Sequence, residues 1–381
     1  MEHVYLDHNA TTPVDDRVLE AMLPYLRGRY GNASSRHELG TVARKAVNVS
    51  REQVAALVNV QPSQVIFVSG GTEANNMFVK GSAGYLKPTQ IAVSAIEHPC
   101  VAKPAQDLAR QGWKLRKLAV TGDGEVDLAD VDEALKEPTG VVSVMLANNE
   151  TGVIQAVAAV AERVRQAKAW MHTDAVQALG KVPVDFQALG VHAMTISAHK
   201  IYGPKGAGAL VVDKRLQLRP IIHGGGHEQG LRSGTENVPA IVGFGAACEL
   251  AAGRMQEIAK RQIAMRDRFE RGLNELGAVI FGEDAPRIPN TSYFALKGVM
   301  GETLVIELDR AGYAVAPGAA CSSANPEPSA TLLAMDVDPE LARGAVRFSL
   351  GAGNTLQQVE DFLRALKAVV SRLRSLTAMA V

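Results

Sequence analysis

The sequence predicts an α/β fold in which a large lobe holds a mostly parallel sheet covered by helices, and a smaller α+β lobe follows it. Between about residues 15 and 250, short apolar or β-branched runs alternate with longer helical patterns, which is typical of a parallel sheet. A long helical pattern comes next, at about 240–276, and the remainder mixes a strand pattern with a final amphipathic helix. With 381 residues, 47% of them hydrophobic, the chain is long enough for two lobes with buried cores.

The strands of the large lobe are expected where apolar runs lie between turn signals. The helical pattern at 240–276 would connect the two lobes, with Gly253 as a candidate break. In the smaller lobe, residues 291–296 form a strand pattern and residues 356–373 an amphipathic helix. We find no internal repeat or low-complexity linker and expect the lobes to pack into one rigid body. The expected strands of the large lobe cover residues 65–69, 91–94, 141–147, 170–173, 193–197 and 209–212.

Composition favours a cytoplasmic protein with a small-molecule or protein partner. The 40 basic and 40 acidic residues cancel, which leaves no strong field to hold nucleic acid or a membrane surface. The first residues lack a basic segment followed by an apolar stretch, and no apolar run approaches the roughly 18 residues of a membrane span. Cys100, Cys248 and Cys321 are too few and too scattered for a disulfide framework or a metal site. If one of them matters, it acts as a thiol.

A glycine-rich turn after the first expected strand is a candidate phosphate site. Gly70, Gly71 and Thr72 lie between that strand and a helical pattern, where free backbone N–H groups and the helix dipole would face an anion. Glycines at a junction between a strand and a helix usually form just a turn. This segment alone therefore leaves both interpretations open.

Two further segments place polar side chains just after expected strands. Asp174 follows one strand and either caps the next helix or serves a ligand. Ser197, His199 and Lys200 follow another, and Lys200 is either a surface lysine or one that forms a Schiff base with an aldehyde cofactor. Ligand sites in open α/β sheets lie beyond the carboxyl ends of the strands. Together, the lysine, the acid and the phosphate donors form the set that pyridoxal 5'-phosphate requires.

The sequence resembles the cysteine desulfurases of the NifS/IscS type, which are class V aminotransferases with the PLP-dependent aspartate-aminotransferase fold. The match runs nearly from end to end and keeps its order. The motifs that carry it are Tyr5-Leu-Asp-His-Asn-Ala-Thr-Thr-Pro, Tyr30-Gly-Asn-Ala-Ser-Ser-Arg-His, Ser69-Gly-Gly-Thr-Glu-Ala-Asn-Asn, Glu97-His, Ala147-Asn-Asn-Glu-Thr-Gly, His172-Thr-Asp-Ala-Val-Gln, Ser197-Ala-His-Lys-Ile-Tyr-Gly-Pro-Lys-Gly, Gly224-Gly-Gly-His-Glu-Gln-Gly-Leu-Arg-Ser-Gly-Thr-Glu-Asn, Gly318-Ala-Ala-Cys-Ser-Ser and Arg347-Phe-Ser-Leu-Gly.

This resemblance implies a large PLP-binding domain with a seven-stranded, mostly parallel sheet over residues 15–252. Residues 1–14 and 253–381 would form the small domain, which carries the catalytic-cysteine loop at about 316–330. The resemblance further implies a homodimer that acts on L-cysteine and passes sulfur to an acceptor protein.

The resemblance also assigns roles to individual residues. Lys200 would hold the cofactor covalently, Asp174 would meet its pyridine nitrogen, Gln177 its phenolic oxygen, and His98 would stack on its ring. Arg347, which is otherwise an ordinary surface ion-pair residue, would hold the substrate carboxylate together with Asn149. The expected phosphate ligands are Gly71, Thr72, Ser197, His199 and, from the other subunit, Thr235.

Cys321 decides which reaction the resemblance implies. It lies in a stretch rich in small residues and proline, which predicts an exposed loop where a structural cysteine is rare. Lys200 would remove the substrate's α-proton, the Cys321 thiolate would attack the substrate sulfur to form a persulfide, and alanine would leave. His98 would shuttle protons. Cys100 and Cys248 are interpreted as packing residues.

The sequence departs from the family pattern in the same loop, at Ala319 and at Asn325-Pro326. Its length nevertheless indicates the long-loop group of desulfurases. The chain ends soon after its last expected helix, which favours a dedicated sulfur acceptor. Two rivals stay open: another PLP enzyme of this fold, such as a selenocysteine lyase or an aminotransferase, and an idle sulfur carrier. Iron-sulfur cluster assembly, nitrogenase maturation, tRNA thiolation and DNA phosphorothioation stay open as sulfur destinations.

Overall fold

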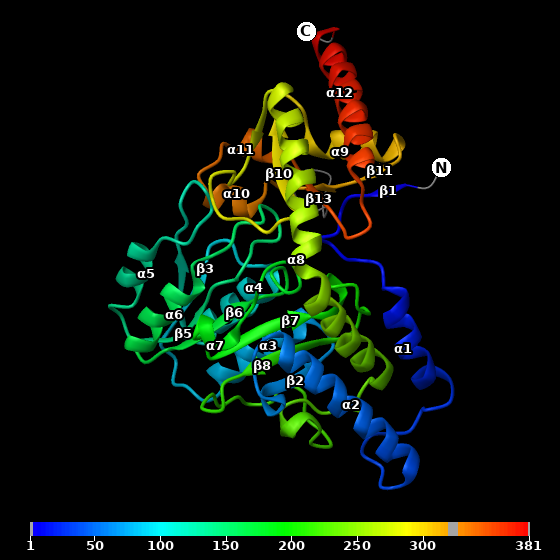
Figure 1. Ribbon diagram of the computed structural model, residues 1–381. Coiled ribbons are helices and arrows are strands. Elements are labelled where there is room, and N and C mark those ends of the chain that lie inside the picture. The colour runs from blue at the N-terminus through cyan, green and yellow to red at the C-terminus, as the bar shows by residue number, and fades with distance from the viewer. Residues whose placement is uncertain (1–2, 319–326, 380–381) are drawn as a thin grey trace.

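The computed structural model describes residues 3–318 and 327–379, and its centre is the predicted α/β sheet (Figure 1). The strand order is β2-β8-β7-β6-β5-β3-β4, and neighbours run parallel except where β8 lies antiparallel to both β2 and β7. The prediction of a mostly parallel, seven-stranded sheet is thus confirmed. The strands are β2 (Val65–Val68), β3 (Gln90–Ser94), β4 (Lys114–Leu118), β5 (Thr139–Ser143), β6 (Trp170–Asp174), β7 (Ala193–Ser197) and β8 (Gly208–Val212).

Helices cover both faces of this sheet, because its central strands bury side chains on both sides. Successive residues of β2 show the pattern: Val65 and Phe67 enter one hydrophobic core, whereas Ile66 and Val68 enter another on the opposite face. The remaining helices of this lobe are α1 (Asp16–Arg27), α2 (Glu38–Leu57), α3 (Gly71–Ala83), α4 (Pro99–Ala109), α5 (Leu128–Ala134), α6 (Val157–Gln166) and α7 (Phe186–Leu189), with the short 3-10 helices η1 (Pro62–Gln64), η2 (Ala198–Lys200) and η3 (Glu228–Gly230).

The smaller lobe holds an antiparallel four-stranded sheet in the order β12-β13-β10-β9. Its core is aromatic, with the ring of Phe269 stacked 4.1 Å from that of Phe348 and next to Phe362. The N-terminal strand β1 pairs in parallel with β11, which ties the start of the chain to this lobe. The elements are β1 (Val4–Tyr5), β9 (Ala278–Ile280), β10 (Thr291–Leu296), α9 (Gly301–Arg310), β11 (Tyr313–Ala314), β12 (Ala316–Pro317), α10 (Ala330–Ala334), α11 (Pro339–Arg343), β13 (Ala345–Ser349) and α12 (Leu356–Met379).

One long helix, α8 (Val238–Glu275), runs through both lobes (Figure 1). Its first part, including Phe244, packs in the core of the large lobe, and its last part, including Phe269, packs in the core of the smaller one. The expected break at Gly253 is wrong, because the helix continues through that residue. A glycine inside a helix costs only about 1 kcal/mol, which tertiary packing at both ends outweighs.

The length and composition of α8 would suffice to cross a membrane, but half of its most apolar stretch is buried inside the protein. It is therefore interpreted as a core helix. The expected strand at 141–147 is shorter in the structure, and β4 was not expected at all. The domain boundary near residue 252 stays a prediction.

Candidate functional site

A cavity of about 380 Å³ lies beyond the carboxyl ends of β2, β6 and β7, where the two lobes meet. Its walls come from segments far apart in the sequence, including the N-terminal segment at Asn9 and Ala10. The site residues expected from the sequence that line this cavity are Gly71, Thr72, His98, Asn149, Asp174, Gln177, Ser197, His199, Lys200 and Arg347.

Lys200 ends the short helix η2, directly after β7, and its amine points into the cavity wall. Its Nζ donates hydrogen bonds to the backbone carbonyls of Asn9 and Ala10, the latter at 2.7 Å. Burial, aided by the Arg347 cation, lowers the pKa of Lys200 to about 8, although Asp7 and Asp174 act in the opposite direction. A substantial fraction of the amine is therefore neutral near physiological pH, as a nucleophile or a base requires.

Asp174 is the last residue of β6 and is almost fully buried. Its carboxylate accepts hydrogen bonds from Asn75 Nδ2 at 2.7 Å and from the backbone N–H of Val176 at 3.0 Å. Burial raises its pKa despite these bonds. The ion pairs of the described residues do not include Asp174, so a cationic group in the cavity would compensate for the buried charge.

His98 caps the N-terminus of α4, with Pro99 as the first helical residue. Its Nδ1 accepts the backbone N–H of Cys100 at 3.2 Å and lies 2.8 Å from the Cys100 Sγ. Since Nδ1 is an acceptor, the ring proton belongs on Nε2. Partial burial lowers the pKa of His98, so the ring is neutral at pH 7. Cys100 lines the cavity, whereas Cys248 is fully buried. Both were expected to be packing residues, and this expectation did not anticipate that Cys100 lies at the cavity.

The turn before α3 forms one wall of the cavity. Gly70 has φ 155°, which is favourable only for glycine, and a Cβ at Gly208 of β8 would come within 2.7 Å of the Gly70 Cα. This close approach leaves the backbone at Gly71 and Thr72 at the cavity, at the start of a 13-residue helix. His199 also lines the cavity; its Nδ1 lies 3.1 Å from the Thr11 Oγ1, and burial lowers its pKa to about 4.

Arg347, on β13 of the smaller lobe, reaches the same cavity. Its Nη2 donates to Asp7 at 2.6 Å and its Nη1 to the carbonyl oxygen of Asn149 at 2.9 Å. These bonds fix the guanidinium plane, while its buried Nε–H has no hydrogen-bond partner among the described residues. Gln177 also lines the cavity, and its Nε2 donates to the carbonyl oxygen of Asn9 at 2.9 Å. The cavity thus combines a positioned cation with amide donors.

Two expected site residues are not part of this cavity. Thr235 is exposed on the segment before α8 and does not line it. Cys321 lies outside the described residues, between Gly318 and Glu327. Conversely, Asn9 belongs to one of the quoted motifs, but no role was predicted for it. Its backbone carbonyl accepts hydrogen bonds from Lys200 and Gln177, and its side-chain oxygen accepts one from Lys181. The position of Asn9 within the N-terminal motif could have indicated a role. No local sequence pattern, however, indicates that this motif folds back onto β7.

Comparisons with known proteins agree on one relationship. The family model described as aminotransferase class-V matches residues 4–362. A curated relative, "Cysteine desulfurase IscS" of Dictyoglomus turgidum, is 40% identical over 378 residues and covers 98% of this chain and 96% of its own. A "Cysteine desulfurase" of Sinorhizobium fredii is 42% identical over 379 residues, 98% of each chain.

Solved structures give the same picture. A "NIFS-LIKE PROTEIN" superposes with a TM-score of 0.92 at 38% identity, over 97% of this chain and 99% of that one. A structure titled "SspA in complex with cysteine" superposes with a TM-score of 0.81 at 30% identity, over 92% of this chain and 99% of that one.

Proposed function

Because the chain belongs to the class-V aminotransferase family and is a cysteine desulfurase, we propose that it binds pyridoxal 5'-phosphate at Lys200 and transfers the sulfur of free L-cysteine to Cys321. The products would be L-alanine and an enzyme-bound persulfide that passes to an acceptor protein. The observation that carries this proposal is the convergence of Lys200, Asp174 and His98, from three separate strand ends, on one cavity.

The residues of the cavity fit this cofactor. Asp174, buried and outside the ion pairs of the described part of the chain, suits the protonated pyridine nitrogen. The His98 ring would lie against the cofactor ring, and Gln177 would donate to its phenolic oxygen. Once bound, pyridoxal phosphate supplies an electron sink for the substrate's α-carbon. Its phosphate would be held by Gly71, Thr72, Ser197, His199 and, across a dimer, Thr235.

Lys200 has two tasks in this proposal. It would hold the cofactor covalently, and its Nζ, once released by the incoming substrate amine, would take the substrate's α-proton. Its lowered pKa, about 8, makes Nζ a competent base at neutral pH. The carbonyls of Asn9 and Ala10 would hold the released amine in place through the hydrogen bonds described above.

Arg347 and Asn149 would bind the substrate carboxylate. The guanidinium is already oriented by Asp7 and by the Asn149 carbonyl, so little conformational entropy is lost when the carboxylate docks. Arg347 lies on the smaller lobe, and so do Gly318 and Glu327, the described residues that flank Cys321.

The sulfur step would belong to Cys321. Its thiolate forms a bond to the substrate sulfur, the substrate's Cβ–S bond breaks, and the electron pair of that bond passes to Cβ. A proton, delivered by Lys200 Nζ or His98 Nε2, then completes the methyl group of alanine. Chemistry on a free thiol suits the reducing cytoplasm, where we place the protein.

A homodimer accounts for residues outside the cavity. Thr235 is exposed, and so are large apolar side chains on the same lobe, which a second subunit would cover. They are Leu19, Leu26, Tyr30, Leu39 and Val49.

The test uses the cofactor-loaded protein and L-cysteine, and measures alanine and protein-bound sulfane sulfur in parallel. The wild type should form both, Lys200→Ala should form neither, and Cys321→Ser should lose the bound sulfur. Cys248→Ala is the matched control, since that thiol lies inside α8, away from the cavity. Exchange of the amino group with a 2-oxo acid, without bound sulfur, would instead identify an aminotransferase. Preference for selenocysteine would identify a lyase.

A further inference from the structure

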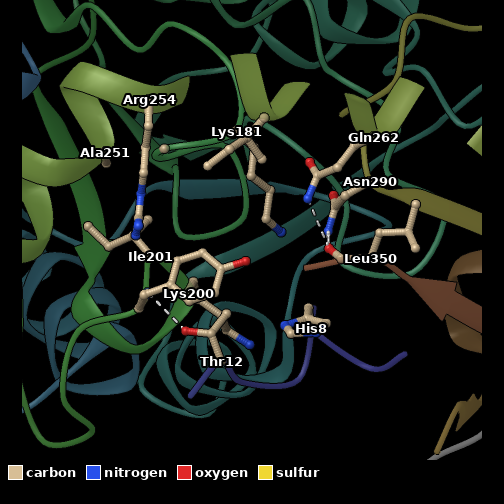
Figure 2. A pocket seen from close by; sticks show the side chains of 13 residues that line it. His8, Thr12, Lys181, Lys200, Ile201, Ala251, Arg254, Gln262, Asn290 and Leu350 are labelled. Carbon is tan, nitrogen blue, oxygen red and sulfur yellow. Dashed lines mark hydrogen bonds between the residues drawn. The ribbon is translucent and has the colours of Figure 1, made fainter. Parts of the chain in front are cut away.

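A second lysine, Lys181, lies behind the cofactor cavity. Its side chain borders a small inner cavity of about 30 Å³, which Lys200 also lines and which has room for one or two water molecules. In Figure 2 this side chain extends into the cavity between Arg254 and Asn290. Burial, together with the Lys200 and Arg347 cations, lowers the pKa of Lys181 well below its usual range.

The amine of Lys181 has two acceptors. Its Nζ donates to the Gln177 Oε1 at 2.7 Å and to the Asn9 Oδ1 at 2.9 Å. A neutral amine carries two N–H donors, so both are used by these bonds. The ion pairs of the described residues do not include Lys181, so nothing in that part of the chain compensates a charged form.

These bonds decide which edge of the Gln177 amide faces the cofactor cavity. Because Oε1 accepts from Lys181, Nε2 must lie on the opposite edge, where it donates one N–H to the Asn9 carbonyl at 2.9 Å. A flipped amide would leave one Lys181 N–H without its acceptor and would set two oxygens against each other at Asn9. The second N–H of Nε2 is therefore left for a ligand in the cavity.

Lys181 also supports Lys200 through Asn9. The Asn9 side-chain oxygen accepts from Lys181 and from Asn290 Nδ2 at 3.1 Å, and its Nδ2 donates to Thr291 Oγ1 at 2.8 Å. The side chain of Asn9 is thus held at both ends, and its backbone carbonyl stays directed at Lys200. The Lys181 amine therefore holds both the Gln177 amide and Asn9 in position at the cofactor cavity.

We infer that Lys181 is a positioning residue, which fixes the Gln177 amide with an N–H towards the cofactor's phenolic oxygen and holds the Asn9 carbonyl against Lys200. This inference rests on the proposed function, because the ligand of Gln177 is the proposed cofactor. Lys181 itself does not line the cofactor cavity, so it acts through Gln177 and Asn9.

Loss of Lys181 has a predictable electrostatic sign. Without a fixed N–H from Gln177, the negative charge on the cofactor's phenolic oxygen would be less neutralised. This charge would raise the affinity of the neighbouring Lys200 nitrogen for its proton. A negative charge beside a protonated nitrogen raises the pKa of that nitrogen. Arg347, Asp7, Asp174 and His98 also face this nitrogen, and they are unchanged in the variants compared below.

The experiment uses Lys181→Met, whose unbranched side chain fills the space without donating. The cofactor-loaded variant is titrated with base while the visible absorbance of the bound cofactor is recorded, and cofactor affinity is measured by equilibrium dialysis. Relative to the wild type, the pH midpoint of this absorbance titration should rise by about half a pH unit or more. The variant should also bind the cofactor about three- to tenfold more weakly. Lys136→Met, on an exposed lysine paired with Glu133, is the control and should change neither value.

A double-mutant cycle separates positioning from a general structural role. In a Gln177→Leu background, Lys181→Met should change the midpoint and the affinity less than in the wild type, since one of its two targets is gone. Equal effects in both backgrounds, or no effect in the wild-type background, would overturn the inference. A wild-type protein without cofactor absorbance would instead overturn the proposed function. Circular dichroism of the cofactor-free variants identifies any that fail to fold, and Lys181→Leu then replaces Lys181→Met in the cycle.

Discussion

The guanidinium of Arg347 is held by the carboxylate of Asp7, whose Oδ1 accepts its Nη2–H at 2.6 Å. The two residues are far apart in the sequence and meet because the N-terminal segment follows β13 at the Asp7–Ser349 bridge. Both side chains are largely shielded from water, so this pair is less screened than a surface ion pair. The orientation of the proposed carboxylate-binding group therefore depends on the first few residues of the chain.

Asp7→Asn should weaken substrate binding. The neutral amide orients Arg347 less firmly, so we expect the KM for L-cysteine to rise about tenfold with a smaller change in kcat. Asp16→Asn, at an exposed position in the first turn of α1, is the control. Steady-state alanine formation provides both constants. A fall in kcat at constant KM would show instead that Asp7 acts mainly on Lys200.

The Lys200 amine should titrate near pH 8 in the cofactor-free protein. Amine-selective labelling followed by mass spectrometry should reach half its maximal rate at about that pH, because only the neutral amine reacts. Arg347→Met removes a cation and should move the midpoint up, whereas Asp7→Asn should move it down. Lys136, whose pKa is raised by Glu133, is the internal reference and should react at higher pH. A midpoint near that of Lys136 would contradict this assignment.

Thiol labelling should single out Cys321. Burial raises the pKa of Cys100 to about 12 and that of Cys248 further still, so neither forms much thiolate at pH 8. Iodoacetamide should therefore modify about one thiol per native chain, and all three after unfolding. Peptide mapping identifies the site. Rapid labelling that persists in Cys321→Ser would show that another thiol is reactive.

Glu228→Gln should destabilise the protein. Glu228 forms a two-point ion pair with Arg51 at 2.6 and 2.7 Å and accepts the backbone N–H of Phe67, all within the interior. Leaving Arg51 uncompensated there should cost about 3 kcal/mol in the free energy of unfolding. Asp213→Asn, which breaks the exposed pair with Arg215, should cost under about 1 kcal/mol. Urea unfolding monitored by fluorescence compares the two, and equal costs would refute the difference.

Gly318→Ala should disturb the segment just before Cys321. An added methyl group would overlap the hydroxyl oxygen of Tyr293, a fully buried side chain that donates to Glu150 at 3.1 Å. We expect a loss of about 2 kcal/mol, because the surroundings are already packed. Tyr293→Phe removes the overlapping hydroxyl, so the double variant should lose less than the sum of the two single variants. Strict additivity in thermal unfolding would contradict this contact.

Much of the fold could be predicted because the central strands are short apolar runs that alternate with longer helical patterns. Strand β4 was not predicted, because Lys114–Leu118 is an edge strand and lacks an apolar run. Its lysine and arginine side chains protect the exposed edge from pairing with other chains. The antiparallel direction of β8 could not be predicted either, because apolar patterning carries no information on direction. Direction depends on how the connecting segment turns.

Most of the proposed site could be predicted from motifs at strand ends, which a parallel sheet brings together. Lys181 and Asn9 could not be assigned in this way. A lysine after a turn normally indicates a solvated side chain, and only the tertiary structure turns the Lys181 amine inwards to Gln177. The role of Asn9 similarly depends on contacts with residues more than 100 positions away.

The uninterrupted helix α8 has a mechanical consequence. With 38 residues at about 1.5 Å each, it forms a strut about 57 Å long that belongs to both hydrophobic cores. Neither core can come apart without fraying a helix on which the other depends, so the two should melt as a single cooperative unit. Both lobes would then unfold in the same thermal transition, although each lobe has its own sheet.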